Sequence, residues 1–286
     1  MSIAQLPFRQ FPATTQSYTT RDTMLYALGI GIGNEPADPL HLRFVYENGL
    51  LSVPTFAATL GSPAAWMWEP DSYIDGKHLV ALSHDLEIFH ELPTAGTVIS
   101  QVRVTDVFDR GREKGALIHW ERDLTDVASG KLLSRMRARA LARGNGGFEG
   151  PPPPGRTAER IPERPADFQE KWATTRAQAL IYRLSGDANL LHVDPAVAQE
   201  AGFKRPILHG LCSLGIVSFL IIKIACAGDP GQLRRISARY AGIVYPGETL
   251  CIELWREETC WVFQCRSDEH KHLVLDGGVA VVDSGT

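Results

Sequence analysis

A stretch rich in glycine and proline near the middle of the chain limits what the sequence can fold into. It opens at 144–147 (GNGG) and includes four consecutive prolines at 151–154. Neither a helix nor a central strand continues through it, because proline removes a backbone donor and glycine removes conformational constraint. We therefore expect two domains, 1–143 and 166–286, joined by a linker at 144–165. The prolines should stiffen this linker into a strap over the surface.

The two domains match each other at a nearly constant offset, which indicates an internal duplication. Three pairs of positions correspond in this way: Tyr26 with Tyr182, Pro54 with Pro206, and Thr97 with Thr249. Each half also ends in strand-like segments that alternate in polarity and carry β-branched residues. These segments are 97–108, 116–125 and 131–141 in the first half, and 236–244, 249–255, 260–266 and 272–282 in the second. The pattern predicts an α+β fold with antiparallel meanders.

One segment of the second half, 210–227, is apolar nearly all round and is closed by 228–230 (GDP). Such a pattern predicts a helix that is buried on every side, as it would be with a sheet wrapped around it. A membrane span is the alternative. The segment is short against the ~20 residues that a bilayer requires, and it carries Ser213, Ser218 and Lys223, so the buried helix is favoured.

An unusual density of acid-base groups lies at 182–192 (YRLSGDANLLH), shortly before 206–210 (PILHG). We expect Asp187 on a turn and His192 on a following helix, where one water molecule can bridge them. Asn189 can hydrogen-bond while staying neutral. The alternative is that these residues have only structural roles, since Gly-Asp-x-Asn is a common turn composition and a single histidine is more often structural than catalytic.

These two motifs resemble those of the R-specific 2-enoyl-CoA hydratases (hydratase 2, MaoC-like), in their two-domain form. First-half segments at 26–29, 92–96 and 109–111 extend the likeness to nearly the whole chain. The resemblance implies a double hot-dog fold, in which each half is a sheet curled around a helix. It also implies reversible, stereospecific addition of water to trans-2-enoyl-CoA, giving (3R)-3-hydroxyacyl-CoA in fatty-acid metabolism.

The resemblance assigns the catalytic residues to the second half. Asp187 and His192 would handle protons on one water, with Asp187 as the base, and Asn189 would position groups. Gly210 would open the buried helix, whose first amides can bind an enolate oxygen at the positive end of the helix dipole. We expect His209 to shape the loop. The first half has 28–33 (LGIGIG) after its tyrosine, so one active site per chain is expected.

Arg110 and Tyr240 are expected to bind substrate, since Arg110 takes the family position of a basic residue that meets coenzyme A. Two departures from the family pattern stand out. Leu190 replaces a proline, which removes no functional group, and Ala81-Leu82 replaces a His-Gly pair at the ligand site of relatives.

The first half is expected to receive the acyl chain. Its counterpart of the buried helix, 54–63 (PTFAATLGSP), is interrupted by Gly61 and Pro63, so a full-length helix is not expected there. A shorter helix would leave volume inside the sheet for an acyl tail. The first half would then bind the tail and carry no catalytic residues of its own.

Composition sets the expected partners and location. A formal net charge of −4 and 22% charged residues favour neither nucleic acid nor a membrane as a partner. The resemblance implies an acyl-CoA as the partner, and a homodimer is possible. The five cysteines form no metal-ligand pattern and are expected to be reduced thiols, so no metal or other cofactor is expected beside the coenzyme A thioester. With no export signal and no peroxisomal address at 283–286, we expect a cytoplasmic protein.

Two other functions stay open at this point. A hot-dog thioesterase is the nearest enzyme alternative, and a catalytically inactive acyl-CoA-binding module is the non-enzyme alternative. The intact set of Asp187, Asn189 and His192 argues against the inactive module.

Overall fold

The computed structural model describes residues 2–154 and 160–283, so part of the expected linker and the last residues of the chain lie outside the described ranges. Ten strands form one sheet, and every neighbouring pair is antiparallel. The strands of the first half are β1 (Thr14–Tyr18), β2 (Leu79–Ile88), β3 (Gly96–Asp109), β4 (Ala116–Asp126) and β5 (Leu132–Ala142). Those of the second half are β6 (Phe168–Ala173), β7 (Leu233–Tyr240), β8 (Thr249–Arg256), β9 (Trp261–Ser267) and β10 (Leu273–Val282).

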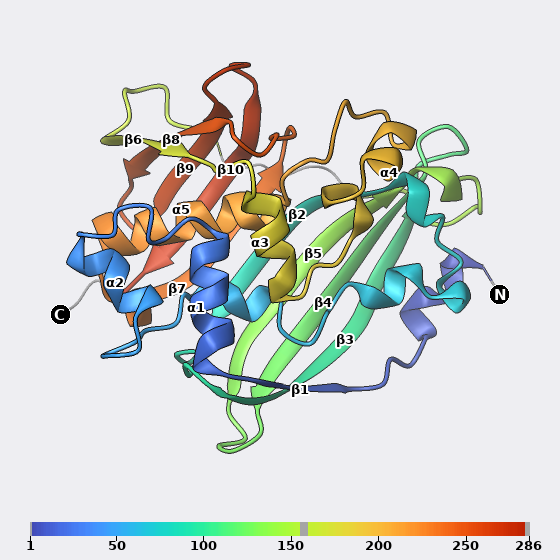
Figure 1. Ribbon diagram of the computed structural model, residues 1–286. Coiled ribbons are helices and arrows are strands. Elements are labelled where there is room, and N and C mark those ends of the chain that lie inside the picture. The colour runs from blue at the N-terminus through green and yellow to red at the C-terminus, as the bar shows by residue number, and fades with distance from the viewer. Residues whose placement is uncertain (1, 155–159, 284–286) are drawn as a thin grey trace.

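The strand order repeats between the halves. The order across the sheet is β1-β3-β4-β5-β2-β7-β10-β9-β8-β6, so each half runs from its first strand at the outer edge to its second strand at the centre. The halves join through β2 and β7, where Asp85 pairs with Ser237. The predicted meander strands are confirmed, whereas β1, β2 and β6 were not predicted. The sheet is therefore continuous across both halves (Figure 1).

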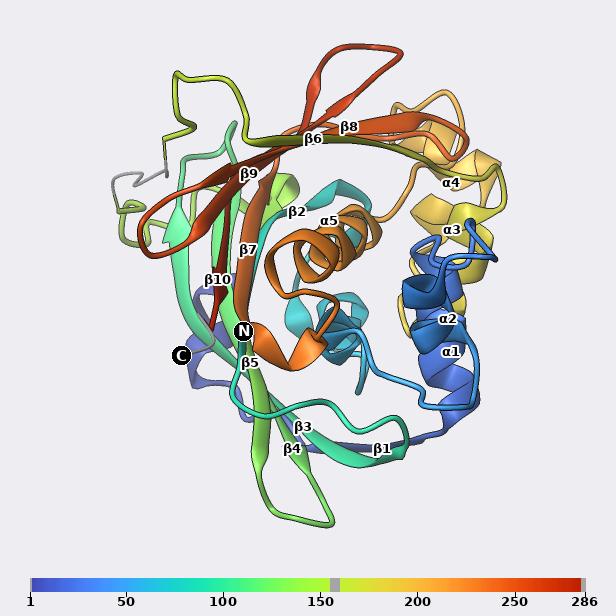
Figure 2. The same ribbon diagram turned by 90° about the vertical axis from the view of Figure 1, so that its left-hand side faces the viewer.

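The helices lie on the concave side of the sheet. They are α1 (Thr20–Gly29), α2 (Pro39–Val45), α3 (Gln178–Tyr182), α4 (Pro195–Glu200) and α5 (Gly210–Ala225). Short 3-10 helices are η1 (Ile3–Phe8), η2 (Pro54–Ala58), η3 (Ala65–Trp68), η4 (Pro70–Ser72), η5 (Gly76–His78), η6 (Arg143–Asn145), η7 (Arg183–Ser185), η8 (Leu190–His192) and η9 (Pro230–Gln232). Figure 2 shows α5 inside the curve of the sheet, with α1, α2 and α3 as a further layer beyond it.

The expected buried helix is confirmed as α5, which has 16 residues and is buried almost throughout. Among the described residues, no helix has both the length and the apolar character to cross a membrane. The first half has only the five-residue η2 in the corresponding place, as the interruption at Gly61 and Pro63 predicts. Ser218 of α5 and Thr55 of η2 are hydrogen-bonded at 2.9 Å, so the two central elements pack directly against each other.

The beginning of the linker is fixed to the turn between β3 and β4. The Asp109 carboxylate accepts hydrogen bonds from the backbone N–H groups of Gly147 and Glu149, both at 2.8 Å, and the Asp109 N–H donates to the Pro151 carbonyl. These backbone hydrogen bonds lower the pKa of Asp109. These contacts hold this part of the linker against the end of β3.

Candidate active site

The acid-base groups of the second half lie on a turn that a glycine makes possible. Gly186 has φ = +120°, and a Cβ there would lie 2.8 Å from the carbonyl oxygen of Thr59, which belongs to the first half. The Asp187 carboxylate then accepts from the Asn189 N–H at 3.3 Å, and the Asn189 side chain accepts from the Leu191 N–H at 3.0 Å. Asn189 is thereby the N-cap of η8.

His192 ends η8 and is buried, with 8% of its surface exposed. Its Nδ1 lies 2.8 Å from the carbonyl oxygen of Ile207. A carbonyl only accepts, so Nδ1 carries the hydrogen and Nε2 of the neutral ring is left as an acceptor. Burial lowers the pKa of His192, and the nearby Asp187 only partly opposes this effect. His192 is therefore a neutral acceptor at pH 7.

His209, the residue before α5, stacks on His192 with 3.7 Å between ring centroids. Its Nε2–H donates to the backbone carbonyl of Asp187 at 3.3 Å, which ties the turn to the start of α5. Burial lowers the pKa of His209 well below its usual value, and the neighbouring His192 adds to this effect. Polar atoms of Asp187, His192 and His209 lie within 4.8 Å of one another, close enough to share one water molecule.

Gly210 is the first residue of α5, so its N–H has no partner within the helix and lies at the positive end of the helix dipole. A Cβ at this position would lie 2.8 Å from the ring of Tyr240 at the end of β7. Only glycine lets the ring and the start of the helix approach this closely. The start of α5 at Gly210 thus packs against Tyr240, directly after His209.

The first half contributes His84 to this site. The Tyr240 hydroxyl and His84 Nδ1 are hydrogen-bonded at 2.7 Å. Burial and the positive charge of Arg122 lower the pKa of His84 to about 4, and burial raises the pKa of Tyr240. Sequence reasoning missed His84, because its strand β2 was not predicted and its partner lies in the other half.

The structure brings five of the six expected site residues together: Asp187, Asn189, His192, Gly210 and Tyr240. Arg110 lies apart from them, exposed in the turn between β3 and β4, where its N–H donates to the Gly115 carbonyl. Among the described residues it makes no hydrogen bond or ion pair with this group. Ala81 and Leu82 lie at a β-bulge of β2, next to Ser83, which pairs with Arg239.

Comparison with known proteins covers both halves. Residues 157–276 match the family model of the MaoC like domain, and residues 16–144 match that of the MFE-2 hydratase 2 N-terminal domain. A protein of Arabidopsis thaliana named peroxisomal enoyl-CoA hydratase 2 is 39% identical over 95% of this chain and 93% of its own length.

Solved structures agree with the sequence matches. A MaoC-like dehydratase from Phytophthora capsici aligns over the whole of both chains, with a TM-score of 0.86 and 29% identity. A Mycobacterium tuberculosis protein described as a double hotdog fold aligns over 96% of each chain, with a TM-score of 0.58 and 13% identity. This last likeness concerns the fold alone, and it confirms the expected double hot-dog.

Proposed function

Because the chain belongs to the two-domain hydratase 2 family of MaoC-like proteins, we propose that it is an R-specific 2-enoyl-CoA hydratase. The reaction is the reversible addition of water to trans-2-enoyl-CoA, giving (3R)-3-hydroxyacyl-CoA, and the enzyme is a hydro-lyase. The observation that supports it most strongly is the grouping of Asp187, His192 and His209, whose polar atoms lie within 4.8 Å of one another directly before Gly210 begins α5.

One water molecule is held between Asp187 and His192. One of its hydrogens points to the Asp187 carboxylate and the other to His192 Nε2, which is free to accept because Nδ1 donates to Ile207. The water oxygen attacks C3 of the enoyl group while Asp187 takes one proton. Asp187 then gives that proton to C2, so the atoms of one water are divided between C3 and C2.

Negative charge develops on the thioester oxygen as the water oxygen adds to C3. The Gly210 N–H stabilises this enolate oxygen, and such a donor typically lowers a barrier by about 2.7–4 kcal/mol. Tyr240, held by His84, closes the opposite side of the thioester. His209 positions the turn by its stacking on His192 and its hydrogen bond to the Asp187 carbonyl. We propose that Arg110 meets coenzyme A further out.

No metal or redox cofactor is needed in this proposal, because hydration changes no net oxidation state and Asp187 and Gly210 handle the charge.

We propose a reducing compartment such as the cytoplasm, which fits five free cysteines, although the Arabidopsis relative is named peroxisomal. Microscopy of the chain with a fluorescent tag in its own cell tests this location. Light scattering of the purified chain tests the expected homodimer.

Hydration of crotonyl-CoA tests the function directly. Loss of the absorbance of the conjugated enoyl thioester without release of free thiol is the expected result. Release of free thiol would indicate a thioesterase, and binding with neither change would indicate an inactive module.

A further inference from the structure

A buried arginine with unused donors lies inside the first half. Arg122 of β4 is 0% exposed, and its Nη2 donates to the carbonyl of Ala57 in η2. Its Nε and Nη1 have no hydrogen-bond partner among the described residues. Guanidinium donors that are buried without acceptors cost free energy, so this position calls for a further acceptor.

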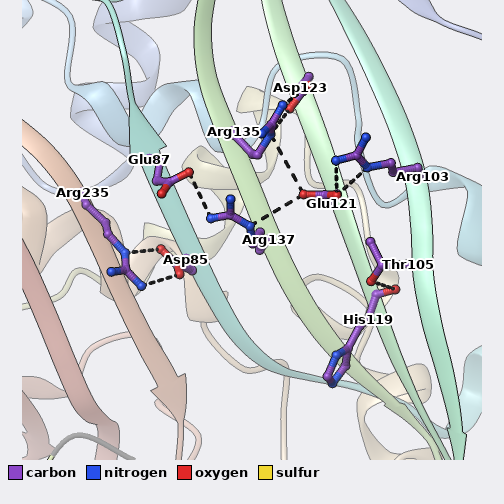
Figure 3. A network of polar contacts seen from close by, with 10 residues as sticks. All are labelled: Asp85, Glu87, Arg103, Thr105, His119, Glu121, Asp123, Arg135, Arg137 and Arg235. Atoms are coloured by element: carbon purple, nitrogen blue, oxygen red, sulfur yellow. Dashed lines mark hydrogen bonds and ion pairs between the residues drawn. The ribbon is translucent and has the colours of Figure 1, made fainter.

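The neighbouring carboxylates do not neutralise Arg122. Glu121 and Asp123 precede and follow it, but strand alternation turns their side chains to the outer face of the sheet. There Glu121 pairs with Arg103, and Asp123 pairs with Arg135 at 2.6 Å (Figure 3). In the described part of the chain, no carboxylate lies within ion-pair distance of Arg122. Burial lowers the pKa of Arg122 to about 9, so it remains a cation at neutral pH.

The duplicated half is apolar at the corresponding positions. Alignment of β3 on β8 through Thr97 and Thr249 relates three buried polar residues to three apolar ones: Ser100 to Ile252, Arg122 to Phe263 and Ser134 to Leu275. The hydroxyls of Ser100 and Ser134 are also buried without a partner among the described residues. The interior of the first half is therefore polar where that of the second half is filled with hydrocarbon.

Arg122 lies at a defined distance from the catalytic groups. In the order β7-β2-β5-β4, its strand is three strands from that of Tyr240, and the register places Arg122 level with Ile236, four residues before Tyr240. The separation along the sheet is therefore roughly 20 Å at the usual spacings. His84 lies between them, bonded to Tyr240 and close enough to Arg122 for its pKa to be lowered by that charge. An extended chain covers about 1.2 Å per bond, so about sixteen bonds would reach from the region of Tyr240 to Arg122.

We propose that Arg122 receives a carboxylate at the distal end of the acyl tail, so that the preferred substrates are ω-carboxy enoyl-CoA thioesters with tails of about sixteen carbons. A carboxylate supplies both the missing negative charge and acceptor oxygens for the unused N–H groups. The proposal rests on the hydratase function, because it names the substrate class of that same site.

The experiment compares kcat/KM for two enoyl-CoA substrates of equal length, one ending in a carboxylate and one in a methyl group. The wild-type chain is expected to prefer the carboxylate at least about tenfold, as a hydrogen-bonded charge pair allows. Arg122→Met should remove that preference, while crotonyl-CoA, which is too short to reach Arg122, should be hydrated as before.

Two further variants serve as a control and as a conservative substitution. Arg139→Met removes an exposed arginine from the outer face of β5 and should leave the preference unchanged. Arg122→Lys keeps the charge without the planar fork, so it should retain part of the preference even if Arg122→Met does not fold. A wild-type chain without any preference, or a preference that survives Arg122→Met, would overturn the proposal. Absence of crotonyl-CoA hydration would instead contradict the hydratase function.

Discussion

At the scale of single residues, the site depends on which atoms are left free. Ile207 uses the Nδ1 hydrogen of His192, so Nε2 faces the reaction as an acceptor. Tyr240 occupies the space that a side chain at position 210 would need, so only glycine fits at the start of α5. The hydrogen bond to Ile207 therefore fixes the tautomer of His192, and the packing of Tyr240 fixes the residue type at position 210.

Asp187→Asn and His192→Gln should each lower kcat for crotonyl-CoA by about 10²–10⁴-fold, because each removes a group that handles protons. Circular dichroism should show that both variants fold, since neither removes apolar core volume. Asp194→Asn is a matched control, because asparagine also caps a helix well and Asp194 only caps α4. Near-native turnover by either site variant would show that the pair is assigned wrongly.

The pH profile of kcat/KM should reflect the low pKa of His192. Burial lowers that pKa, so the neutral ring persists below pH 6.5, the value at which an ordinary histidine is half protonated. The rate should therefore stay flat from pH 8 through pH 6.5 and fall only at lower pH. A decline centred at or above pH 6.5 would contradict the assignment of His192 as a neutral acceptor.

His84 should make the folded state sensitive to acid. The unfolded chain takes up a proton on this residue below about pH 6.5, whereas in the folded chain its pKa is about 4. Falling pH therefore favours unfolding through this window, by on the order of 3 kcal/mol in total. Urea unfolding at pH 6.5 and pH 4.5 should show a smaller loss of stability for His84→Gln than for the wild type. Equal losses in the two proteins would mean that His84 titrates normally.

At the scale of elements, the two halves differ most in their central segment. The second half has the 16-residue α5, whereas the first has the five-residue η2 followed by Gly61 at φ = +76°. A Cβ at Gly61 would lie 2.3 Å from the Cβ of Ser100, so the chain turns here against β3. We predict that this shorter element lets the first half receive the acyl tail.

Ala57→Leu should lower kcat/KM for long-chain substrates by about tenfold or more and leave crotonyl-CoA turnover nearly unchanged. Ala57 and Ala58 are each 2% exposed within η2, so a larger side chain takes up interior volume that the tail would need. Ala128→Leu, in the exposed turn between β4 and β5, is the control. Equal losses on short and long substrates would place the tail elsewhere.

At the scale of the whole molecule, the sheet joins the halves so that one active site draws on both. β2 and β7 pair at the centre, and this places His84 beside Tyr240 and Thr59 beside Gly186. The second half holds Asp187, Asn189 and His192, and the first half contributes His84 and Thr59 beside this group.

If the water binds in the second half and the acyl tail in the first, hydration should give a single enantiomer of the 3-hydroxyacyl product. The water is held on the side of Asp187 and His192, while the tail is directed into the first half, so only one face of the enoyl plane meets the water. Chiral chromatography of the hydrated product should show the R alcohol alone. An S product or a racemate would contradict both the proposed water position and the R-specific assignment.

The sequence by itself determined the features that depend on local chemistry. The turn composition placed Asp187, the apolar run from Gly210 predicted α5, and Gly61 with Pro63 excluded a second long helix. Most meander strands followed from alternation. The catalytic roles of these residues stay predictions until the variants are measured.

Only the tertiary structure decided which distant residues meet. β1 and β6 are edge strands with few residues, and a bulge between Ala81 and Ser83 breaks the alternation of β2, so local pattern did not predict these three strands. The hydrogen bond between His84 and Tyr240 depends on the pairing of β2 with β7. The burial of Arg122 with its Nε and Nη1 unpaired among the described residues depends on the packing inside the sheet. Such contacts join residues far apart in the chain, and no local propensity encodes them.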